Sequence, residues 1–425
     1  MDVKAATLAG RSRAPAQHVV VIIGGGAAGI TVAAELRKHR PGLEVAIVEP
    51  SDSHSYQPGW TLVGAGVFSQ AQTERPEYSL IPKGVTWIRA AATEFRPQFN
   101  EVCLSDGSSL IYQYLVVCPG LKLDWDKIEG LSEALGSNGV CSNYRADAAE
   151  YTWTCLREFR GGAALFTQPP MPIKCAGAPQ KIMYLAADYW RKRGRLAQSK
   201  IEFCLAGDVL FGVPFFVPPL QAAINKYGIG VAYKHNLKAI DGRAKKAIFT
   251  ATDASGQPCE VTKQFDMIHV VPPQTGLDVV RSSPLANQVG WVDIDQATLR
   301  HTRFDNVFGL GDATSTPNAK TAAAVRIQAP VVVANLLATM DRRSMPKQYD
   351  GYGSCPLTVA YGKIVLAEFA YGGKVTPSFP LDPRVPRRSA WYLKTRFLPW
   401  LYWHHMFSGG EFDLPHKERK FSEAA

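Results

Sequence analysis

The chain has 425 residues, of which 46% are hydrophobic, and a formal net charge of +10 at pH 7. The length suggests about three structural units, and the positive charge favours anionic partners such as acidic phospholipids. Because no RNA- or DNA-binding motif accompanies the charge, we expect no nucleic-acid partner.

The sequence also argues against several other classes of protein. Residues 1–17 lack the apolar core of a secretory signal, and we expect a flexible tail there. No uninterrupted apolar run approaches about 18 residues, which predicts that no helix spans a membrane. The eight cysteines show neither the density of a disulfide framework nor the spacing of a zinc site, so we expect no metal.

The first motif follows an apolar strand predicted over 17–23. A G-x-G-x-x-G sequence comes next, a helix is predicted over 27–38, and an acidic residue ends the following strand about 20 residues after the last glycine. The glycines allow a tight turn and a close approach of a pyrophosphate, and the helix N-terminus stabilises the phosphate charge. The residues expected to contact the dinucleotide are Gly24, Gly26, Ala27, Ala28, Gly29 and Glu49.

A second nucleotide fold is predicted to begin with a strand over 163–166, followed by a helix over 179–193 and strands over 201–206 and 267–271. The glycine loop that a pyridine nucleotide needs after the first of these strands is absent. The sequence there, QPPMPIKCAGAPQK, contains prolines and then Cys175. We therefore expect a redox protein that receives electrons from a thiol-reactive substrate and not from NADH.

A second strong motif, FDNVFGLGDAT, occupies residues 304–314. A strand that ends in Gly-Asp just before a helix, here predicted over 321–340, places the carboxylate of Asp312 near the ribityl hydroxyls of a flavin. The other interpretation of Asp312 is a helix N-cap, a position that Asp favours. Together with the first fingerprint, the motif predicts an FAD domain built from two separate parts of the chain.

The composition becomes rich in prolines and aromatic residues from residue 346 onward. Residues 389–407 contain Trp, Tyr and Phe with basic side chains beside them, and Pro399 is expected to interrupt any continuous helix. Such a segment suits a membrane interface, where these aromatic side chains have one apolar and one hydrated end. The alternative is a core helix that closes the substrate domain.

On these motifs and several others, the chain resembles the sulfide:quinone oxidoreductase family of glutathione-reductase-like flavoproteins, in the branch that includes the mitochondrial enzyme. The resemblance implies non-covalent FAD, hydrogen sulfide as electron donor, ubiquinone or menaquinone as electron acceptor, and a sulfur acceptor such as glutathione, sulfite or cyanide. It also implies monotopic attachment to a bacterial cytoplasmic membrane or a mitochondrial inner membrane, and it leaves a homo-oligomer open. The further matching stretches are residues 55–66, 172–185, 290–295, 320–325, 349–356 and 365–369.

The resemblance further implies that Cys175 and Cys355 form the redox pair. Hydrosulfide attacks their disulfide or trisulfide, one cysteine becomes a persulfide, and two electrons pass through FAD to the quinone. Which cysteine keeps the sulfur stays open. The local sequence agrees for Cys175, because a predicted helix N-terminus and the neighbouring Lys174 and Lys181 lower the pKa of a thiol.

Other roles are also implied by the resemblance. Glu133 matches a carboxylate that assists proton transfer near the sulfide site, although it reads equally well as a surface acid. The lysine that follows the Gly-Asp motif is expected to stabilise an anionic reduced flavin. The residues that the family places at the cofactor are Gln57, Ala92, Gly120, Asp312 and Lys320.

The predicted fold class is α/β, with two Rossmann-like dinucleotide-binding domains and a C-terminal membrane-associating segment. The alternatives are a type II NADH:quinone oxidoreductase, a sulfide dehydrogenase that passes electrons to a cytochrome, and a flavin-bound redox sensor without turnover. The missing second glycine loop argues against the first, and the retained cysteines argue against the last. The predicted units are a tail (1–17), the first part of the FAD domain (18–145), the second Rossmann-like domain without an NAD fingerprint (146–275), the second part of the FAD domain (276–345) and a C-terminal quinone and membrane-interface region (346–425).

Overall fold

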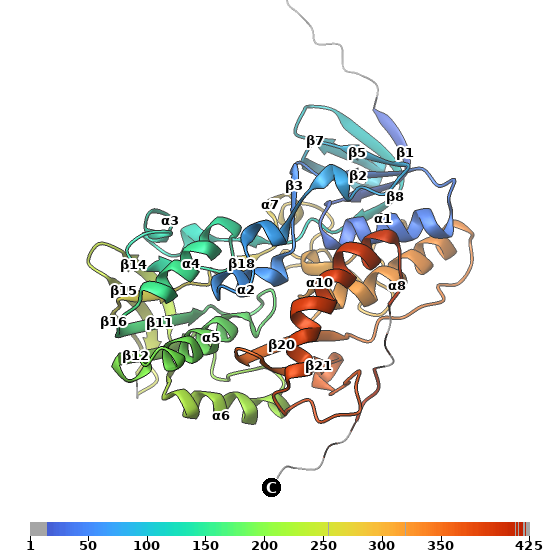
Figure 1. Ribbon diagram of the computed structural model, residues 1–425. Helices are drawn as coiled ribbons and strands as arrows, with labels where there is room; N and C mark the ends of the chain where they lie inside the picture. The colour runs from blue at the N-terminus through green and yellow to red at the C-terminus, as the bar shows by residue number, and fades with distance from the viewer. Residues whose placement is uncertain are drawn as a thin grey trace, which may run out of the picture.

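Figure 1 shows the computed structural model of the chain, which describes residues 15–253, 255–318, 320–412, 414, 416–419 and 421. Most of the expected tail therefore lies outside the described residues, and the first strand begins at Ala16. One sheet lies at the top of the view and a second at the lower left, and the C-terminal segment, drawn in red, runs beside both. The predicted α/β class with two Rossmann-like sheets is confirmed.

The first sheet is built around an apolar strand that pairs in parallel with a neighbour on each side. Residues 20–23 are buried, as a strand covered on both faces requires. Helices α1 (Ala27–His39) and α8 (Ala322–Met340) pack against each other beside this strand. In spatial order the strands are β5 (Val85–Ile88), β2 (Val45–Val48), β1 (Ala16–Ile23), β8 (Ser109–Val117), β7 (Glu101–Leu104) and β6 (Ala92–Arg96), with β19 (Val307–Gly309) paired to β8.

Helix α8 is, among the described residues, the one helix long and apolar enough to cross a membrane, with 19 residues and a mean hydropathy of 1.4. The sequence expectation of no such helix was based on uninterrupted apolar runs, and Arg326, Gln328 and Asn335 interrupt the run in α8. The mean hydropathy of α8 is nevertheless high enough. Its buried side chains belong to the same core as those of β1 and β8. Its place in the fold is therefore that of a core helix of the first sheet.

The second sheet is entirely parallel, as in a nucleotide-binding fold. Its first strand, β10 (Val140–Cys141), comes before residue 146, so the second sheet begins earlier than the expected domain boundary. A three-stranded antiparallel sheet follows it. The order in the parallel sheet is β10, β17 (Met267–His269), β11 (Gly162–Gln168), β12 (Ser199–Leu205) and β13 (Gly230–Tyr233), and the antiparallel sheet consists of β14 (Asn236–Asp241), β15 (Lys246–Thr252) and β16 (Pro258–Gln264).

Helices and short elements complete the two domains. Helix α5 (Ala178–Lys192) is almost wholly buried and packs against strand β20 (Gly353–Ala360), which pairs with β21 (Lys363–Phe369). This packing brings the part of the chain near residue 355 onto the helix that follows residue 175. The remaining elements are α2 (Trp60–Gly64), α3 (Leu131–Ala134), α4 (Ala146–Glu158), α6 (Val217–Tyr227), α7 (Asp278–Arg281), β3 (Ser53–Ser55), β4 (Glu74–Pro76), β9 (Lys122–Leu123) and β18 (Gln274–Thr275).

Residues 388–408 form one winding helical segment, which we call the terminal helix. It contains α9 (Arg388–Tyr392), a π-helical turn, α10 (Leu398–Trp400), a second π-helical turn and a final 3₁₀ turn. The expectation that Pro399 interrupts the helix is wrong, because Leu398 (φ −64°, ψ −39°) and Leu401 (φ −55°, ψ −44°) keep helical dihedrals. The π turns on both sides change the hydrogen-bond register, so the missing proline N–H does not end the helix.

Two glycines of the first motif separate folding from ligand binding. A Cβ at Gly29 would lie 1.8 Å from the Gly24 carbonyl oxygen, whereas a Cβ at Gly26 would meet no atom within 4 Å. We expect Gly29→Ala to lower the free energy of unfolding of the apoprotein by about 3 kcal/mol, because backbone must move. Gly26→Ala should leave it unchanged and reduce the bound dinucleotide, as measured by denaturant titration and flavin absorbance. Equal stability loss in both variants would contradict this division.

Candidate functional site

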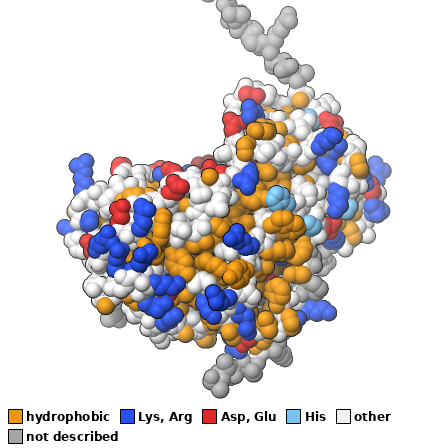
Figure 2. Space-filling model, viewed as in Figure 1, with side chains coloured by type: hydrophobic (Ala, Val, Ile, Leu, Met, Phe, Trp, Pro, Cys, Tyr) orange, Lys and Arg blue, Asp and Glu red, His pale blue; other side chains and the backbone are white. Residues whose placement is uncertain are grey.

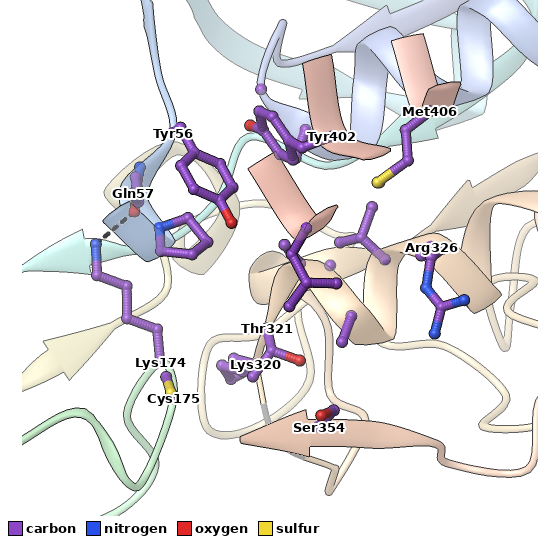
Figure 3. Close-up of a pocket in the computed structure, with 18 of the residues that line it drawn as sticks. Tyr56, Gln57, Lys174, Cys175, Lys320, Thr321, Arg326, Ser354, Tyr402 and Met406 are labelled. Carbon is purple, nitrogen blue, oxygen red and sulfur yellow. Dashed lines mark hydrogen bonds between the residues drawn. The ribbon is translucent and has the colours of Figure 1, made fainter. Parts of the chain in front are cut away.

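A cavity of about 490 Å³ lies where the carboxyl end of the first sheet, the start of α5 and the terminal helix meet. Figure 3 shows Lys174 and Cys175 on one side of it and Tyr402 and Met406 of the terminal helix on another. The carboxyl edge of a parallel sheet is where such folds bind their ligands. Of the residues predicted to act, those that line the cavity are Gly24, Gly26, Ala27, Ala28, Glu49, Gln57, Gly120, Cys175, Asp312 and Lys320.

The glycine loop fits the pyrophosphate end of a dinucleotide. Gly24 has a φ of +105°, and a Cβ there would approach the Cys118 carbonyl oxygen to 2.6 Å. Gly26, which precedes the first turn of α1, opens onto free space, so a phosphate can approach the backbone N–H groups. Glu49 accepts a hydrogen bond from the Gly25 N–H at 2.8 Å, which fixes the acid beside the loop. These features match the requirements of the AMP half of FAD.

The opposite end of the cavity contains a buried lysine, Lys320, and a half-buried aspartate, Asp312. The Lys320 ammonium donates to the carbonyl oxygens of Asp312 (2.9 Å) and Thr314 (2.8 Å), and it lies 4.1 Å from the Trp291 ring centre. Burial lowers the pKa of Lys320 to about 8, although the negative charge of Asp312 acts to raise it. Burial also raises the pKa of Asp312. The chain can thus present a cation and an acid to the flavin end of FAD.

The cofactor loop is joined directly to the cysteine loop. The Cys175 N–H donates to the Lys320 carbonyl oxygen at 2.9 Å. On the other side, the Lys174 ammonium donates to the Gln57 side-chain oxygen at 2.7 Å, the contact drawn as a dashed line in Figure 3. Burial lowers the pKa of Lys174 to about 8. Cys175 is therefore held between two segments that line the cofactor cavity.

The two cysteines meet beside this cavity although 180 residues separate them. Their sulfur atoms are 3.8 Å apart, both thiols are free, and Cys355 is fully buried on β20. Cys175 has a φ of +49°, a left-handed conformation that non-glycine residues seldom adopt. Lys181, in the second turn of α5, places its ammonium 3.0 Å from the Cys175 sulfur. The arrangement allows thiol–disulfide exchange beside a cation.

The surroundings of the two thiols are electrostatically unequal. The hydrogen bond with Cys355, followed by the charges of Lys181 and Lys394, holds the pKa of Cys175 well below its usual range. The same hydrogen bond and burial raise the pKa of Cys355 well above its usual range. Burial by itself would lower the pKa of Lys181. The interactions with the neighbouring cysteine sulfurs have a larger combined effect, so the pKa of Lys181 is raised. The Lys181 ammonium, 3.0 Å from the Cys175 sulfur, thus favours Cys175 over Cys355 as the thiolate of the pair.

The terminal helix contributes side chains that the sequence patterns do not reveal. Lys394 is buried, donates to the Pro58 carbonyl oxygen at 3.3 Å, and has its pKa lowered to about 7 by burial and by the charge of Lys181. The Tyr402 hydroxyl lies 2.6 Å from the His54 ring nitrogen Nε2. The π turns that bring Lys394 to the buried face have no recognised sequence signal, although a lone lysine among aromatic residues is one hint.

Two predicted residues lie elsewhere. Glu133 is exposed on α3, which packs against β14, and it does not line the cavity. Its place corrects the expectation that it assists proton transfer beside the cysteines. Ala92 is half-buried on the edge strand β6, where it pairs with Leu104, and it does not line the cavity either. Gly29 packs against the loop and supports it without lining the cavity.

Comparison with known proteins agrees with this geometry. Residues 18–150 match the pyridine nucleotide-disulphide oxidoreductase family. The chain is 43% identical over 393 residues to the mitochondrial sulfide:quinone oxidoreductase of Dictyostelium discoideum, an alignment that covers 92% of the chain and 86% of the relative. It is 41% identical to the mouse mitochondrial sulfide:quinone oxidoreductase, with coverages of 92% and 87%. The sulfide:quinone oxidoreductase structure from Aquifex aeolicus shares the fold, with a TM-score of 0.73, 21% identity and coverages of 93% and 92%.

The charge of Lys181 gives the first prediction for this site. In the reduced protein, iodoacetamide should alkylate Cys175 as a thiolate. The rate of this reaction should rise with pH at a midpoint below that of an ordinary cysteine. Lys181→Met removes a cation 3.0 Å from the sulfur, so the pKa of Cys175 rises and the midpoint moves to higher pH. The measurement is the rate of iodoacetamide modification of Cys175 against pH, followed by peptide mass spectrometry. Lys192→Met, at the far end of α5, is the matched control, and equal midpoints in the two variants would refute the role of Lys181.

Proposed function

The chain belongs to the sulfide:quinone oxidoreductase family, and from this we propose that it oxidises hydrogen sulfide at Cys175 and Cys355 and passes the electrons through FAD to a membrane quinone. The observation that supports the residue assignment most directly is the 3.8 Å separation of the two sulfurs beside the cofactor cavity. FAD supplies the two-electron relay between the thiol chemistry and the quinone. Gly24, Gly26, Glu49, Asp312 and Lys320 are the residues proposed to hold it.

The difference in pKa between the two thiols indicates which cysteine carries the persulfide. When hydrosulfide attacks the Cys175–Cys355 disulfide, the better leaving group is the cysteine with the lower thiol pKa. That cysteine is Cys175, whose thiolate lies 3.0 Å from the Lys181 ammonium. The new S–S bond then forms on Cys355, the Cys175–Cys355 bond breaks, and the electron pair of that bond stays on Cys175. We therefore assign the persulfide to Cys355.

The positive charge of the cavity favours an anionic sulfur acceptor. Lys174, Lys181 and Lys394 line the cavity from three segments. The Lys181 ammonium faces the Cys175 sulfur, and the Lys174 ammonium contacts Gln57. A thiolate or oxyanion, such as glutathione or sulfite, can take the outer sulfur of the persulfide and leave a cysteine thiol. The Cys355 thiol and the Cys175 thiolate then form their disulfide again, which releases one proton and two electrons that bound FAD would accept. This restores the starting state of the protein.

FAD is proposed to bind without a covalent link. Besides Cys175, the cysteine that lines the described cavity wall is Cys118. Its sulfur points to the Gly24 carbonyl oxygen at 3.8 Å, and burial raises the pKa of its thiol far above the usual range. A thiol that stays protonated is a poor nucleophile, so Cys118 is not suited to attach a flavin.

A second cavity of about 510 Å³ suits the apolar tail of a quinone. It lies between β21, residues 377–385 and the terminal helix, and its wall is mainly apolar. It shares five lining residues with the first cavity, namely Leu366, Glu368, Phe379, Leu393 and Phe397. A quinone whose ring reaches the first cavity can therefore keep its tail in the second.

The outer face of the terminal helix suits a membrane surface. Tyr392, Arg396, Trp400 and His404 are exposed at a spacing of four residues, with Tyr392 60% and Trp400 51% exposed. Figure 2 shows hydrophobic side chains gathered over this part of the molecule, with Lys and Arg at its borders. Aromatic and basic side chains on one exposed face are typical of monotopic attachment to an anionic bilayer. The relatives from Dictyostelium discoideum and mouse are named mitochondrial, and we propose a membrane-attached enzyme of that kind.

The alternative of a type II NADH:quinone oxidoreductase is not favoured by the second domain. After β11, where a pyridine nucleotide needs a glycine-rich turn, the chain continues through prolines to Cys175. A Cβ at Gly177, the one glycine between β11 and α5, would approach Leu357 Cδ2 to 2.2 Å, so this glycine serves packing against β20. Reduction of the flavin by sulfide but not by micromolar NADH would separate the two functions.

Each cysteine is expected to be essential for turnover and dispensable for FAD binding. Cys175→Ser and Cys355→Ser should retain the flavin absorbance of the wild-type protein, because neither sulfur holds the cofactor in this proposal. Both should lose sulfide-dependent quinone reduction to below detection, because no disulfide can form. Cys259→Ser, on β16, is the control and should keep full activity. Sulfide turnover in either active-site variant would refute the assignment.

Membrane attachment is best tested with point substitutions on the exposed face, because deleting the terminal helix would also remove Lys394. Tyr392→Glu with Trp400→Glu should lower binding to anionic liposomes by about tenfold or more, since two interfacial aromatic side chains become charged. Flavin content should not change. Phe99→Glu replaces an equally exposed apolar side chain in the first domain and should bind liposomes like the wild type. Unchanged flotation of the double variant would disprove this docking face.

A further inference from the structure

A buried carboxylate lies where the two cavities meet. Glu368, on β21, is 4% exposed and lines both the cofactor cavity and the apolar cavity. Most of the neighbouring wall is apolar, including Leu366 and Phe379, which also line both cavities. A carboxylate is costly in such a place unless it is paired or hydrogen-bonded. The cost of burying Glu368 at this junction therefore suggests that its carboxyl group has a chemical role.

The contacts of Glu368 hold one carboxylate in a fixed position. Its Oε1 atom accepts hydrogen bonds from the Tyr352 hydroxyl and the Ser378 hydroxyl, both at 2.6 Å. Its Oε2 atom accepts from the Ser378 N–H at 3.0 Å. Ser378 is half-buried and precedes Phe379, which is 40% exposed. The network thus extends from the junction of the cavities toward the protein surface.

We propose that Glu368 is a proton-relay residue for reduction of the quinone, an inference that rests on the function proposed above. Reduction of a quinone to a quinol consumes two electrons and two protons. Both electrons come from sulfide oxidation through FAD, and the buried site must receive its protons through the protein. In the relay step the O–H bond of protonated Glu368 breaks and an O–H bond forms on a quinone oxygen. The carboxylate then takes a proton from solvent by way of Ser378.

The alternative is that Glu368 only supports the fold, by tying residues 352 and 378 to β21. A structural role predicts equal effects on every reaction of the flavin. A proton relay affects only an electron acceptor that must be protonated. Ferricyanide accepts electrons without taking up protons, so it separates the two roles in the same sample.

The test starts from FAD-loaded protein that sulfide has reduced under anaerobic conditions. In stopped-flow mixing with decylubiquinone, we expect Glu368→Gln to reoxidise at least about tenfold more slowly than the wild type, a loss in the range of general acid–base catalysis. Mixing with ferricyanide should give the wild-type rate. Glu368→Asp should recover part of the quinone rate, because it restores a titratable carboxylate. Ser378→Ala should slow only the quinone reaction and keep the buried acid.

The matched control is Thr376→Val, which changes a buried hydroxyl in the same segment that has no hydrogen-bond partner among the described residues. It should reoxidise at the wild-type rate with both acceptors. A wild-type quinone rate in Glu368→Gln, or equal slowing with quinone and ferricyanide, would overturn the relay. Failure of sulfide to reduce the wild-type flavin, or of quinone to reoxidise it, would instead contradict the proposed function.

Discussion

The structure around the cysteines depends on the compensation of buried positive charge. Lys181 and Lys394 are buried beside the Cys175 sulfur, and burial alone would lower the pKa of both ammonium groups. Lys181 remains a cation because Cys175 is an anion at 3.0 Å. The lysine and the thiolate therefore stabilise each other's charged form. A cavity with this balance attracts small anions, and hydrosulfide is one.

The same requirement explains why the terminal helix cannot be a simple anchor. Its inner face places Lys394 at the cysteines and Tyr402 at His54, while its outer face exposes Tyr392 and Trp400. A regular α-helix repeats every 3.6 residues, but the exposed positions here repeat every four. The π turns account for this longer repeat, because a π turn contains more residues than an α-helical turn. One helix can then face the membrane on one side and complete the site on the other.

The sequence predicted the nucleotide-binding parts well, because each depends on local backbone requirements. Gly24 and Gly26 mark a turn and a phosphate approach, and Glu49 ends the second strand, so spacing alone places them together. The meeting of Cys175 and Cys355 depended on resemblance, since no local pattern joins the loop before α5 to β20. Glu133 was misplaced because an acid on a short helix has no periodicity that distinguishes a site from the surface. Lys394 was predicted at a membrane interface and not at the cysteines, because π turns carry no known sequence signature.

The loss of a glycine loop in the second domain and the gain of a thiol site are one structural change. In a nucleotide-binding fold the start of the helix after β11 faces a phosphate. Here Lys181, near the start of the same helix, places its ammonium 3.0 Å from the Cys175 sulfur. The sheet still positions the helix, but the anion it stabilises now belongs to the protein. Because β20 packs against that helix, the Cys355 sulfur lies 3.8 Å from the Cys175 sulfur, which Lys181 stabilises as an anion.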